Sequence, residues 1–178
     1  MTNPPESFET ERLQLRKPVI EDADVIFDKY AQDPDVTRYL TWRPNRSVGE
    51  TREFLQAGLV AWREGQSYHW TIVRKEDQEL MGMINARVEN HKWQIGYVLA
   101  RAYWGKGYMT EALRKLIAWA LEQPEISRIW SVCDIENRAS ARVMEKAGMR
   151  REGTLPRWSV HPNLSPEPRD SYCYSVAR

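Results

Sequence analysis

The sequence predicts a mixed α/β fold in one domain, residues 1–178, and two patterns carry this prediction. Three strand-like segments follow one another at residues 68–74, 80–88 and 92–99, as in an antiparallel meander. A helical segment then separates the last of them from another strand-like run at residues 128–134. Because strands joined by a crossover helix are parallel, the predicted sheet contains both kinds of pairing.

The first part of the chain supplies one strand and two helices. Residues 12–16 alternate between apolar and polar side chains, which indicates a strand. Asp22 is expected to cap a helix over residues 22–31, because an aspartate side chain accepts hydrogen bonds from the free amides of a first turn. A second helix is expected over residues 49–64, where four apolar residues recur at helical spacing: Phe54, Leu55, Leu59 and Trp62.

Glycine and proline set the boundaries in the second part of the chain. A helix opened by Gly107 is expected to run to about residue 122, before Pro124, and a short helix over residues 139–147 is ended by Gly148. The longer helix buries one face: Ala112, Leu116, Trp119 and Ala120. Four alternating residues of the meander share one strand face and are interpreted as core: Trp93, Ile95, Tyr97 and Leu99. Two strands close the chain, at residues 149–155 and 171–177.

Composition excludes several kinds of partner. The 26 basic and 25 acidic residues are interspersed, so neither a nucleic-acid surface nor a membrane surface is predicted. The N-terminus lacks the pattern of a signal peptide and no apolar run approaches a membrane span, so the protein is expected to be cytoplasmic. Cys133 and Cys173 lie in strand-like runs without a metal-ligand partner nearby. We therefore predict two buried, reduced thiols and no metal site.

The loop between the third meander strand and the crossover helix contains Gly105, Lys106 and Gly107. The free amides of a helix N-terminus carry partial positive charge, and glycines let phosphate oxygens approach the backbone closely. The pattern therefore favours a pyrophosphate cradle, to which Lys106 adds a full charge. A plain glycine turn is the alternative, and the loop taken alone does not decide between them.

Together with NRASARVMEKAGMRREGTL at residues 137–155, this loop resembles the GNAT superfamily of N-acetyltransferases, and specifically its RimJ/RimL type. Further matches lie at both ends of the chain: Thr10, Glu11, Arg12, Leu13, Leu15, Arg16, Asp22, Ala23, Asp170, Tyr172 and Tyr174. The resemblance implies a twisted mixed sheet of about six or seven strands, split at a bulged strand and flanked by about four helices. It also implies acetyl transfer from acetyl-CoA to a primary amine.

The resemblance implies a cofactor site on two segments. Backbone groups of residues 96–99, Val98 and Leu99 among them, would bind pantetheine as an added strand does. The pyrophosphate would then bind the following loop, with these candidate contacts: Arg101, Trp104, Gly105, Lys106, Gly107 and Tyr108. The first position of the loop signature, usually Gln or Arg, is Ala102 here. Asn137 stands where the family's asparagine lies against the pantetheine arm, and it also suits a helix cap.

Catalytic groups are less completely specified. Many members of the superfamily carry a tyrosine as the acid for the leaving thiolate, but that position here is Met144, which has no proton to donate. Ser140 lies on the same helix face and is the candidate donor in its place. Glu111 and His161 are candidate bases, although each also suits a structural role.

The resemblance places the acceptor between residues 39–43 and residues 158–170, where Trp42 and Trp158 would wall it and Arg43 or Arg157 would pair with a carboxylate on it. Packing of the loops is the alternative role for both tryptophans. A site without a strong base suits a protein N-terminus or another amine of low pKa. A non-catalytic CoA-binding regulatory domain and an acetyltransferase acting on aminoacyl-tRNA are the alternative functions. The resemblance allows a monomer or a homodimer, and it places Cys173 as a cross-strand neighbour of Cys133.

Overall fold

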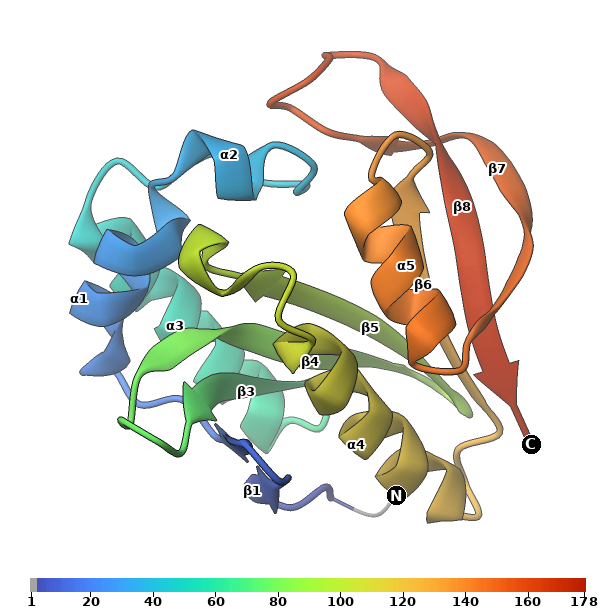
Figure 1. Cartoon of the computed structure of the whole chain (residues 1–178), viewed down its shortest axis with the longest axis horizontal. Coiled ribbons are helices and arrows are strands. Elements are labelled where there is room, and N and C mark those ends of the chain that lie inside the picture. The colour runs from blue at the N-terminus through green and yellow to red at the C-terminus, as the bar shows by residue number, and fades with distance from the viewer. Residues whose placement is uncertain (1–2) are drawn as a thin grey trace.

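The computed structural model describes residues 3–178, which form one eight-stranded sheet with helices on both of its faces (Figure 1). The strands lie in the order β1-β2-β3-β4-β5-β6-β8-β7. In chain order the elements are β1 (Ser7–Glu9), β2 (Leu13–Arg16), α1 (Asp22–Ile26), η1 (Phe27–Ala31), α2 (Pro34–Thr37), α3 (Val48–Arg63), β3 (Ser67–Arg74), β4 (Leu80–Glu89), β5 (Lys92–Leu99), η2 (Arg101–Tyr103), α4 (Tyr108–Glu122), β6 (Arg128–Asp134), α5 (Arg138–Lys146), β7 (Arg150–Val160) and β8 (Pro168–Ala177).

The pairing confirms the mixed α/β class. Strands β1 to β5 pair antiparallel, α4 crosses to β6, and β5 and β6 are parallel. Over residues 3–178 the sheet has eight strands rather than the six or seven expected, and there are five α-helices rather than about four. The unpredicted elements, β1 and α2, contain three and four residues, too few to show a hydrophobic period.

The sheet divides between β5 and β6. These strands pair only through residues 92–94 and 128–130 in the described chain. Beyond them, β5 stays in unbroken register with β4 as far as the Gly82–Leu99 pair, and β6 stays with β8 as far as the Asp134–Ser171 pair. The expected split is therefore confirmed: β5 leaves its parallel neighbour β6 after residue 94, and within residues 3–178 no register shift marks a bulge between β5 and β4. Each strand follows its own half of the twisted sheet, and the halves diverge.

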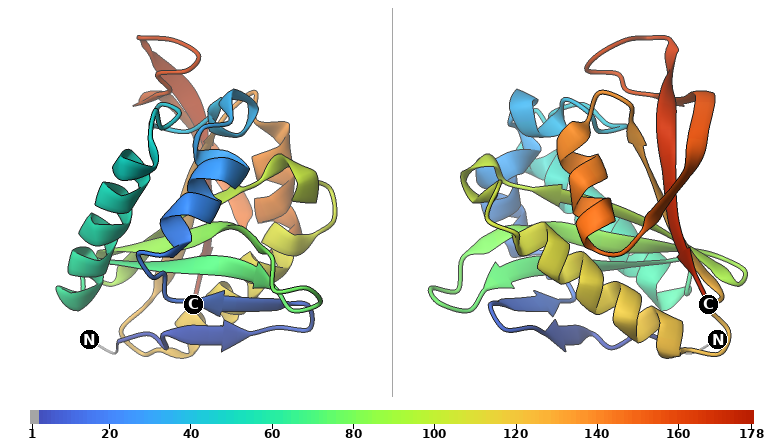
Figure 2. Two further views of the ribbon diagram at one scale, coloured as in Figure 1. Left: turned by 90° about the vertical axis from the view of Figure 1, so that its left-hand side faces the viewer. Right: turned by 45° about the vertical axis from the view of Figure 1, so that its right-hand side comes forward.

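Helix α3 lies on one side of the sheet, and α4 and α5 lie on the other (Figure 2). The predicted core face of β5 is confirmed on the α4 side, where Trp93 and Ile95 are buried and Tyr97 and Leu99 pack against them. The same cluster includes Ala112, Leu116 and Ala120 of α4. No helix within residues 3–178 is both long and apolar enough to cross a membrane.

The helix starts are made in different ways. Helices α3 and α5 are capped by Ser47 and Asn137, whose side chains accept from the backbone amides of Glu50 and Ser140. The expected cap by Asp22 is wrong: Asp22 is the first residue of α1 and forms an ion pair with Arg16, with an Oδ1···Nη2 distance of 2.6 Å. The Asp22 carboxylate thus pairs with Arg16 of β2 and does not accept hydrogen bonds from the first amides of α1.

The last two strands are longer than predicted and form a hairpin that projects toward α2 (Figure 1). Trp158 therefore lies in β7, and the connecting loop shortens to residues 161–167. In this loop, Asn163 Nδ2 donates to the carbonyl oxygens of Thr37 and Trp42, at 2.7 and 2.8 Å. These bonds join the two segments between which the acceptor was expected.

Both cysteines are buried free thiols, as predicted. Their predicted pairing is wrong by one residue, since Cys133 lies opposite Tyr172 and Cys173 opposite Val132. Successive residues of a strand point to opposite faces of the sheet. The two thiols therefore lie on opposite faces.

Candidate active site

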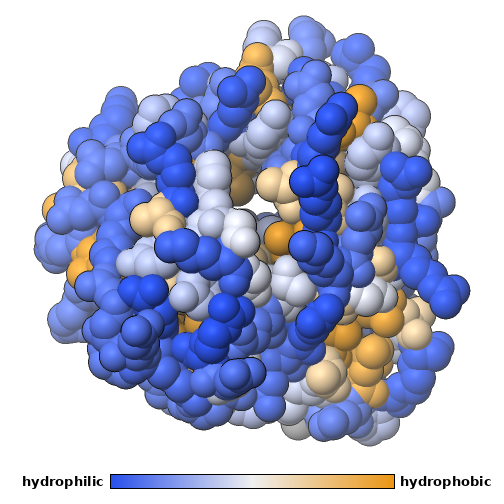
Figure 3. Space-filling model, viewed as in Figure 1, coloured by the Kyte–Doolittle hydropathy of each residue, from blue (hydrophilic) through white to orange (hydrophobic). Residues whose placement is uncertain are grey.

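A cleft of about 2350 Å³ passes between the two halves of the sheet. Residues from β5, the glycine loop, α4, β6 and α5 line one part of it, and residues from α2, α3 and the β7–β8 hairpin line the other. Figure 3 shows the hollow near the middle of the molecule, with pale and apolar side chains inside it and hydrophilic side chains around its rim. We name these two parts the cofactor half and the acceptor half.

The glycine loop opens α4 with left-handed backbone. Gly105 and Gly107 have φ values of +74° and +80°, which side-chain-bearing residues rarely adopt. Gly107 is the N-cap of α4, and among the described residues no side chain caps this helix. Its first amides are therefore free for a ligand, whereas those of α3 and α5 are capped.

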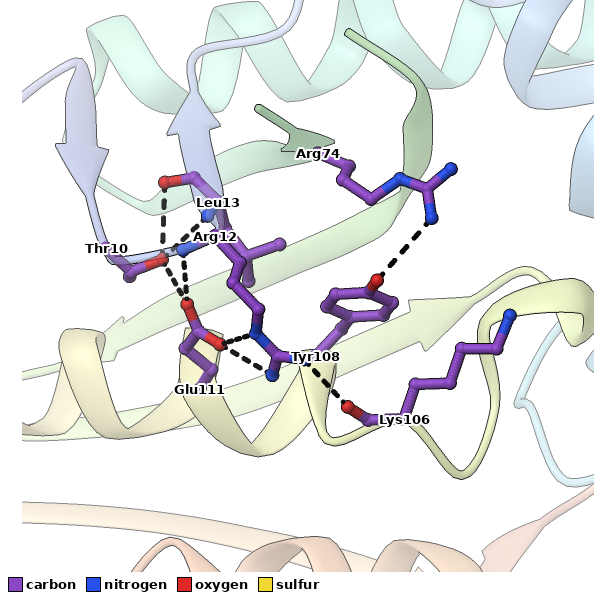
Figure 4. Close-up of polar contacts among 7 residues, drawn as sticks. All are labelled: Thr10, Arg12, Leu13, Arg74, Lys106, Tyr108 and Glu111. Atoms are coloured by element: carbon purple, nitrogen blue, oxygen red, sulfur yellow. Dashed lines mark hydrogen bonds and ion pairs between the residues drawn. The ribbon is translucent and has the colours of Figure 1, made fainter. Parts of the chain in front are cut away.

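A cluster under the loop joins it to the N-terminal segment (Figure 4). Glu111 Oε1 accepts from the Thr10 hydroxyl at 2.6 Å and from the Arg12 amide at 2.9 Å, and Glu111 Oε2 pairs with the Arg12 guanidinium at 2.7 Å. Arg12 also donates to the Lys106 carbonyl at 3.1 Å and lies over the Tyr108 ring. The guanidinium thus connects the carboxylate of α4 to the backbone of the loop.

This cluster opposes the role of general base for Glu111. Burial by itself would raise the pKa of Glu111, but hydrogen bonds from Thr10 and Arg12 outweigh it and lower that pKa. A carboxylate held by several donors is a weak proton acceptor. Glu111 instead fixes the start of α4.

The end of β5 presents backbone groups to the cofactor half. The Ile95 carbonyl accepts from Ser131 Oγ at 2.7 Å, and the Leu99 carbonyl accepts from the Trp104 indole at 2.7 Å. Backbone groups alternate sides along a strand, so those of Tyr97, between the two, also face the cleft. This stretch lies beyond the last pair with β6 and is available to an extended ligand.

Ser140 lies where β5, β6 and α5 meet. The Ser140 and Tyr97 hydroxyl oxygens are 2.8 Å apart, and the Tyr97 hydroxyl is 3.2 Å from the Ser140 carbonyl oxygen. Cys133 also lines this part of the cleft, and burial raises its pKa to about 12. The predicted cap is present, since Asn137 Oδ1 accepts from the Ser140 amide at 3.1 Å.

The structure brings the predicted acceptor residues to the other half. Trp42 is half-buried, Trp158 is 50% exposed, and both line the cleft. Arg43 is exposed but does not line the cleft. Arg157, another arginine of this region, pairs with Glu167 at 3.1 Å.

His161 faces the cleft from the hairpin and is 4% exposed. Within residues 3–178, neither ring nitrogen has a hydrogen-bond partner, and Nε2 is 3.9 Å from Asp134 Oδ2. A buried polar group without a partner is costly, so ordered water or a ligand is expected beside it.

Two other positions differ from the sequence interpretation. Arg101 pairs with Asp33 and Asp35 and does not line the cleft, so a phosphate contact from it is not supported. His69 lines the acceptor half and was not predicted; burial, helped by the charge of Arg87, lowers its pKa to about 4. Its signal was the alternation of β3, which places His69 on the face opposite the aromatic core.

Residues 12–150 match the family of acetyltransferase (GNAT) domains, which covers more than half of the chain. The chain therefore belongs to the GNAT family of acetyltransferases and is an acyltransferase. The proteins similar to it include a ribosomal-protein-serine acetyltransferase and, in fold, a RimL structure.

Three known proteins illustrate the similarity. An uncharacterized N-acetyltransferase, p20 of Bacillus licheniformis, is 36% identical over 153 residues, 84% of this chain and 85% of the relative. The ribosomal-protein-serine acetyltransferase of Escherichia coli (strain K12) is 32% identical over 113 residues, 62% of each chain. The solved structure of the microcin C7 self-immunity acetyltransferase MccE, in complex with acetyl-CoA and AMP, has a TM-score of 0.88 at 20% identity and covers 99% of this chain and 98% of that one. At that identity the likeness concerns the fold.

Proposed function

We propose that this protein binds acetyl-CoA in the cofactor half and transfers the acetyl group directly to a primary amine bound in the acceptor half. The acceptor is an N-terminal α-amine of a protein, or the amine of a small molecule or peptide. The observation that carries the proposal is convergence: the open end of β5, the uncapped start of α4 and the Ser140 hydroxyl line one cleft. A thioester reaching from the loop along β5 would end beside Ser140.

The proposed cofactor contacts follow from this arrangement. The α4 amides and Lys106 hold the pyrophosphate, and the backbone of β5 holds the pantetheine amides. Additional basic residues of α4 and α5 line the same part of the cleft and suit an anionic ligand: Arg114, Lys115, Arg142 and Lys146. The full set of cofactor residues that we propose is Val98, Leu99, Trp104, Gly105, Lys106, Gly107, Tyr108, Asn137 and Ser140.

The carboxylates of the cleft support an amine of low pKa. Four carboxylates line the cleft; Glu9, Asp35 and Glu111 are ion-paired, and within residues 3–178 only the exposed Glu11 is not. An α-amine with a pKa of about 7.8 is roughly one-quarter neutral near pH 7.3, whereas a lysine amine near 10.4 is about 0.1% neutral. The difference is worth about 3.5 kcal/mol. Proximity then supplies much of the remaining acceleration, and His161 is the proposed relay for the released proton.

A screen of acceptors tests the proposal. Release of the CoA thiol is measured with acetyl-CoA and a panel of peptides with free N-termini, the same peptides blocked at the N-terminus but carrying lysine, and small amines. Turnover with free α-amines and none with the blocked lysine peptides is expected. Binding of acetyl-CoA without transfer to any member would indicate a regulatory domain instead.

A further inference from the structure

The cofactor half contains a tyrosine hydroxyl that the sequence interpretation assigned only to the core. Tyr97 stands on β5, opposite α5, and its phenol reaches across the cleft to Ser140. Helix α5 has Met144 on the same face as Ser140, so it contributes no phenol of its own there. Both residues line the cleft.

We propose that Tyr97 is a positioning residue for the leaving thiolate: its hydroxyl donates to Ser140 Oγ and so directs the serine proton into the cleft. This inference rests on the proposed acetyl transfer. A serine hydroxyl has one proton and accepts on its remaining lone pairs. The phenol oxygen lies 2.8 Å from Ser140 Oγ and 3.2 Å from the Ser140 carbonyl oxygen, and when its proton is shared between these two acceptors the serine proton is left for a hydrogen bond to a group in the cleft, which Ser140 lines. The CoA sulfur would take that hydrogen bond in the reacting complex.

The environment of Tyr97 suits a permanent donor. Burial raises the pKa of Tyr97 above its ordinary value, so the phenol keeps its proton throughout the working pH range. A phenol of raised pKa is a poor acid, and Tyr97 therefore orients Ser140 without giving up its own proton.

The step balances without a further reactant. The neutral amine attacks the acetyl carbon, the C–N bond forms, and the C–S bond breaks with its electron pair moving to sulfur. The developing thiolate accepts a hydrogen bond from Ser140, and the nitrogen releases its proton to water, with His161 as the proposed relay. Water then protonates the thiolate. A hydrogen bond to a developing charge lowers the barrier more than it stabilises the neutral thioester.

The structure offers a matched control in Tyr174. This buried tyrosine lies on β8, also under α5, and its hydroxyl donates to Glu145 Oε1 at 2.8 Å. It does not line the cleft. Tyr97→Phe and Tyr174→Phe each remove one phenol hydroxyl that bonds to the same helix, but only the first touches Ser140.

The test is steady-state kinetics with an acceptor found for the wild-type protein, together with acetyl-CoA affinity by calorimetry and thermal unfolding. Tyr97→Phe should lower kcat roughly five- to thirtyfold with acetyl-CoA affinity unchanged, and Tyr174→Phe less than about twofold. Ser140→Ala should lower kcat at least as much, and the double variant should equal Ser140→Ala, because Tyr97 acts only through the serine.

Three results would overturn the inference: equal losses of kcat in the two phenylalanine variants, multiplying losses in the double variant, or unchanged kcat in Tyr97→Phe. Failure of the proposed function is distinguishable, since the wild-type protein would then bind acetyl-CoA without turnover, or not bind it.

Discussion

The two halves of the cleft are built from different parts of the chain. The cofactor half presents main chain: the open edge of β5 and the free amides at the start of α4. The acceptor half presents side chains, including Trp42, Trp158 and His69. Backbone is the same in every sequence that adopts the fold, whereas side chains change with each substitution. A cofactor site of this kind can be shared by a family while the acceptor site varies.

The largest effect is expected from the backbone of the cofactor half. Gly107→Glu should weaken acetyl-CoA binding by more than about a hundredfold, because it places a carboxylate beside a pyrophosphate. Gly148→Glu is the control, since Gly148 has a φ of +95°, open space around it and no place in the cleft. Both variants bear similar backbone strain. Calorimetry on the folded proteins should show lost affinity in the first only; equal affinities would contradict the cradle.

The second effect concerns the cluster that fixes α4. Glu111→Gln should cost about 1–3 kcal/mol of unfolding free energy near neutral pH, because it weakens the bonds to Thr10 and Arg12. Because the pKa of Glu111 is lowered in the folded protein, the ionised carboxylate stabilises the fold at pH values above its ordinary pKa. This stabilisation is lost as the pH falls through the lowered pKa. The difference between variant and wild type should therefore shrink in acid.

Denaturant unfolding at several pH values measures this effect. The control is Glu167→Gln, which removes an exposed ion pair with Arg157 and should change little at any pH. A Glu111→Gln protein of wild-type stability whose activity lost its pH dependence would restore Glu111 as a candidate base.

The difference between backbone features and side-chain contacts also explains what the sequence could predict. Gly105, Gly107 and Gly148 adopt positive φ, so the loop and the helix ends could be inferred from residues that tolerate this backbone. The outcomes for Asp22 and Arg101 could not. Each carries a charge suited to a helix end or a phosphate, but Asp22 meets Arg16 of β2 and Arg101 meets Asp35 of α2. Such partners follow from the fold, and a local pattern does not show them.

For the acceptor half, the sequence predicted which segments line it but not the contacts that its residues make. Asn163 joins the two predicted walls through carbonyls of residues more than 100 positions earlier, and no periodicity indicates such a contact. Tyr97 illustrates the reverse. The alternation of β5 correctly placed Tyr97 on the face that packs in the core. The Tyr97 hydroxyl, however, lies at the end of the side chain, where the core meets the cleft.

A third prediction compares one exposed tryptophan from each half. Trp158 and Trp104 are 50% and 46% exposed, so neither should be essential for folding. Trp158→Ala should raise the acceptor KM roughly tenfold and leave acetyl-CoA affinity unchanged. Trp104→Ala should instead lower acetyl-CoA affinity and leave the acceptor KM unchanged, since its indole donates to the Leu99 carbonyl at the end of β5. Steady-state kinetics give the acceptor KM and calorimetry gives the acetyl-CoA affinity of both variants. If Trp158→Ala also lost thermal stability in proportion to its loss of acceptor use, that tryptophan would have a structural role.

The smallest effect separates two cations beside the glycine loop. Arg101 pairs with Asp33 and Asp35 and is directed away from the cleft, whereas Lys106 lines it. Arg101→Ala should therefore change acetyl-CoA affinity less than about twofold, and Lys106→Ala should lower it roughly three- to tenfold, the range of one partly screened charge near a phosphate. Raising the salt concentration should narrow the difference in acetyl-CoA affinity between Lys106→Ala and wild type, because the contribution of Lys106 to binding is electrostatic. Calorimetry at two ionic strengths gives both quantities, and a larger loss in Arg101→Ala than in Lys106→Ala would mean that the arginine leaves its aspartates and turns to the cofactor when acetyl-CoA binds.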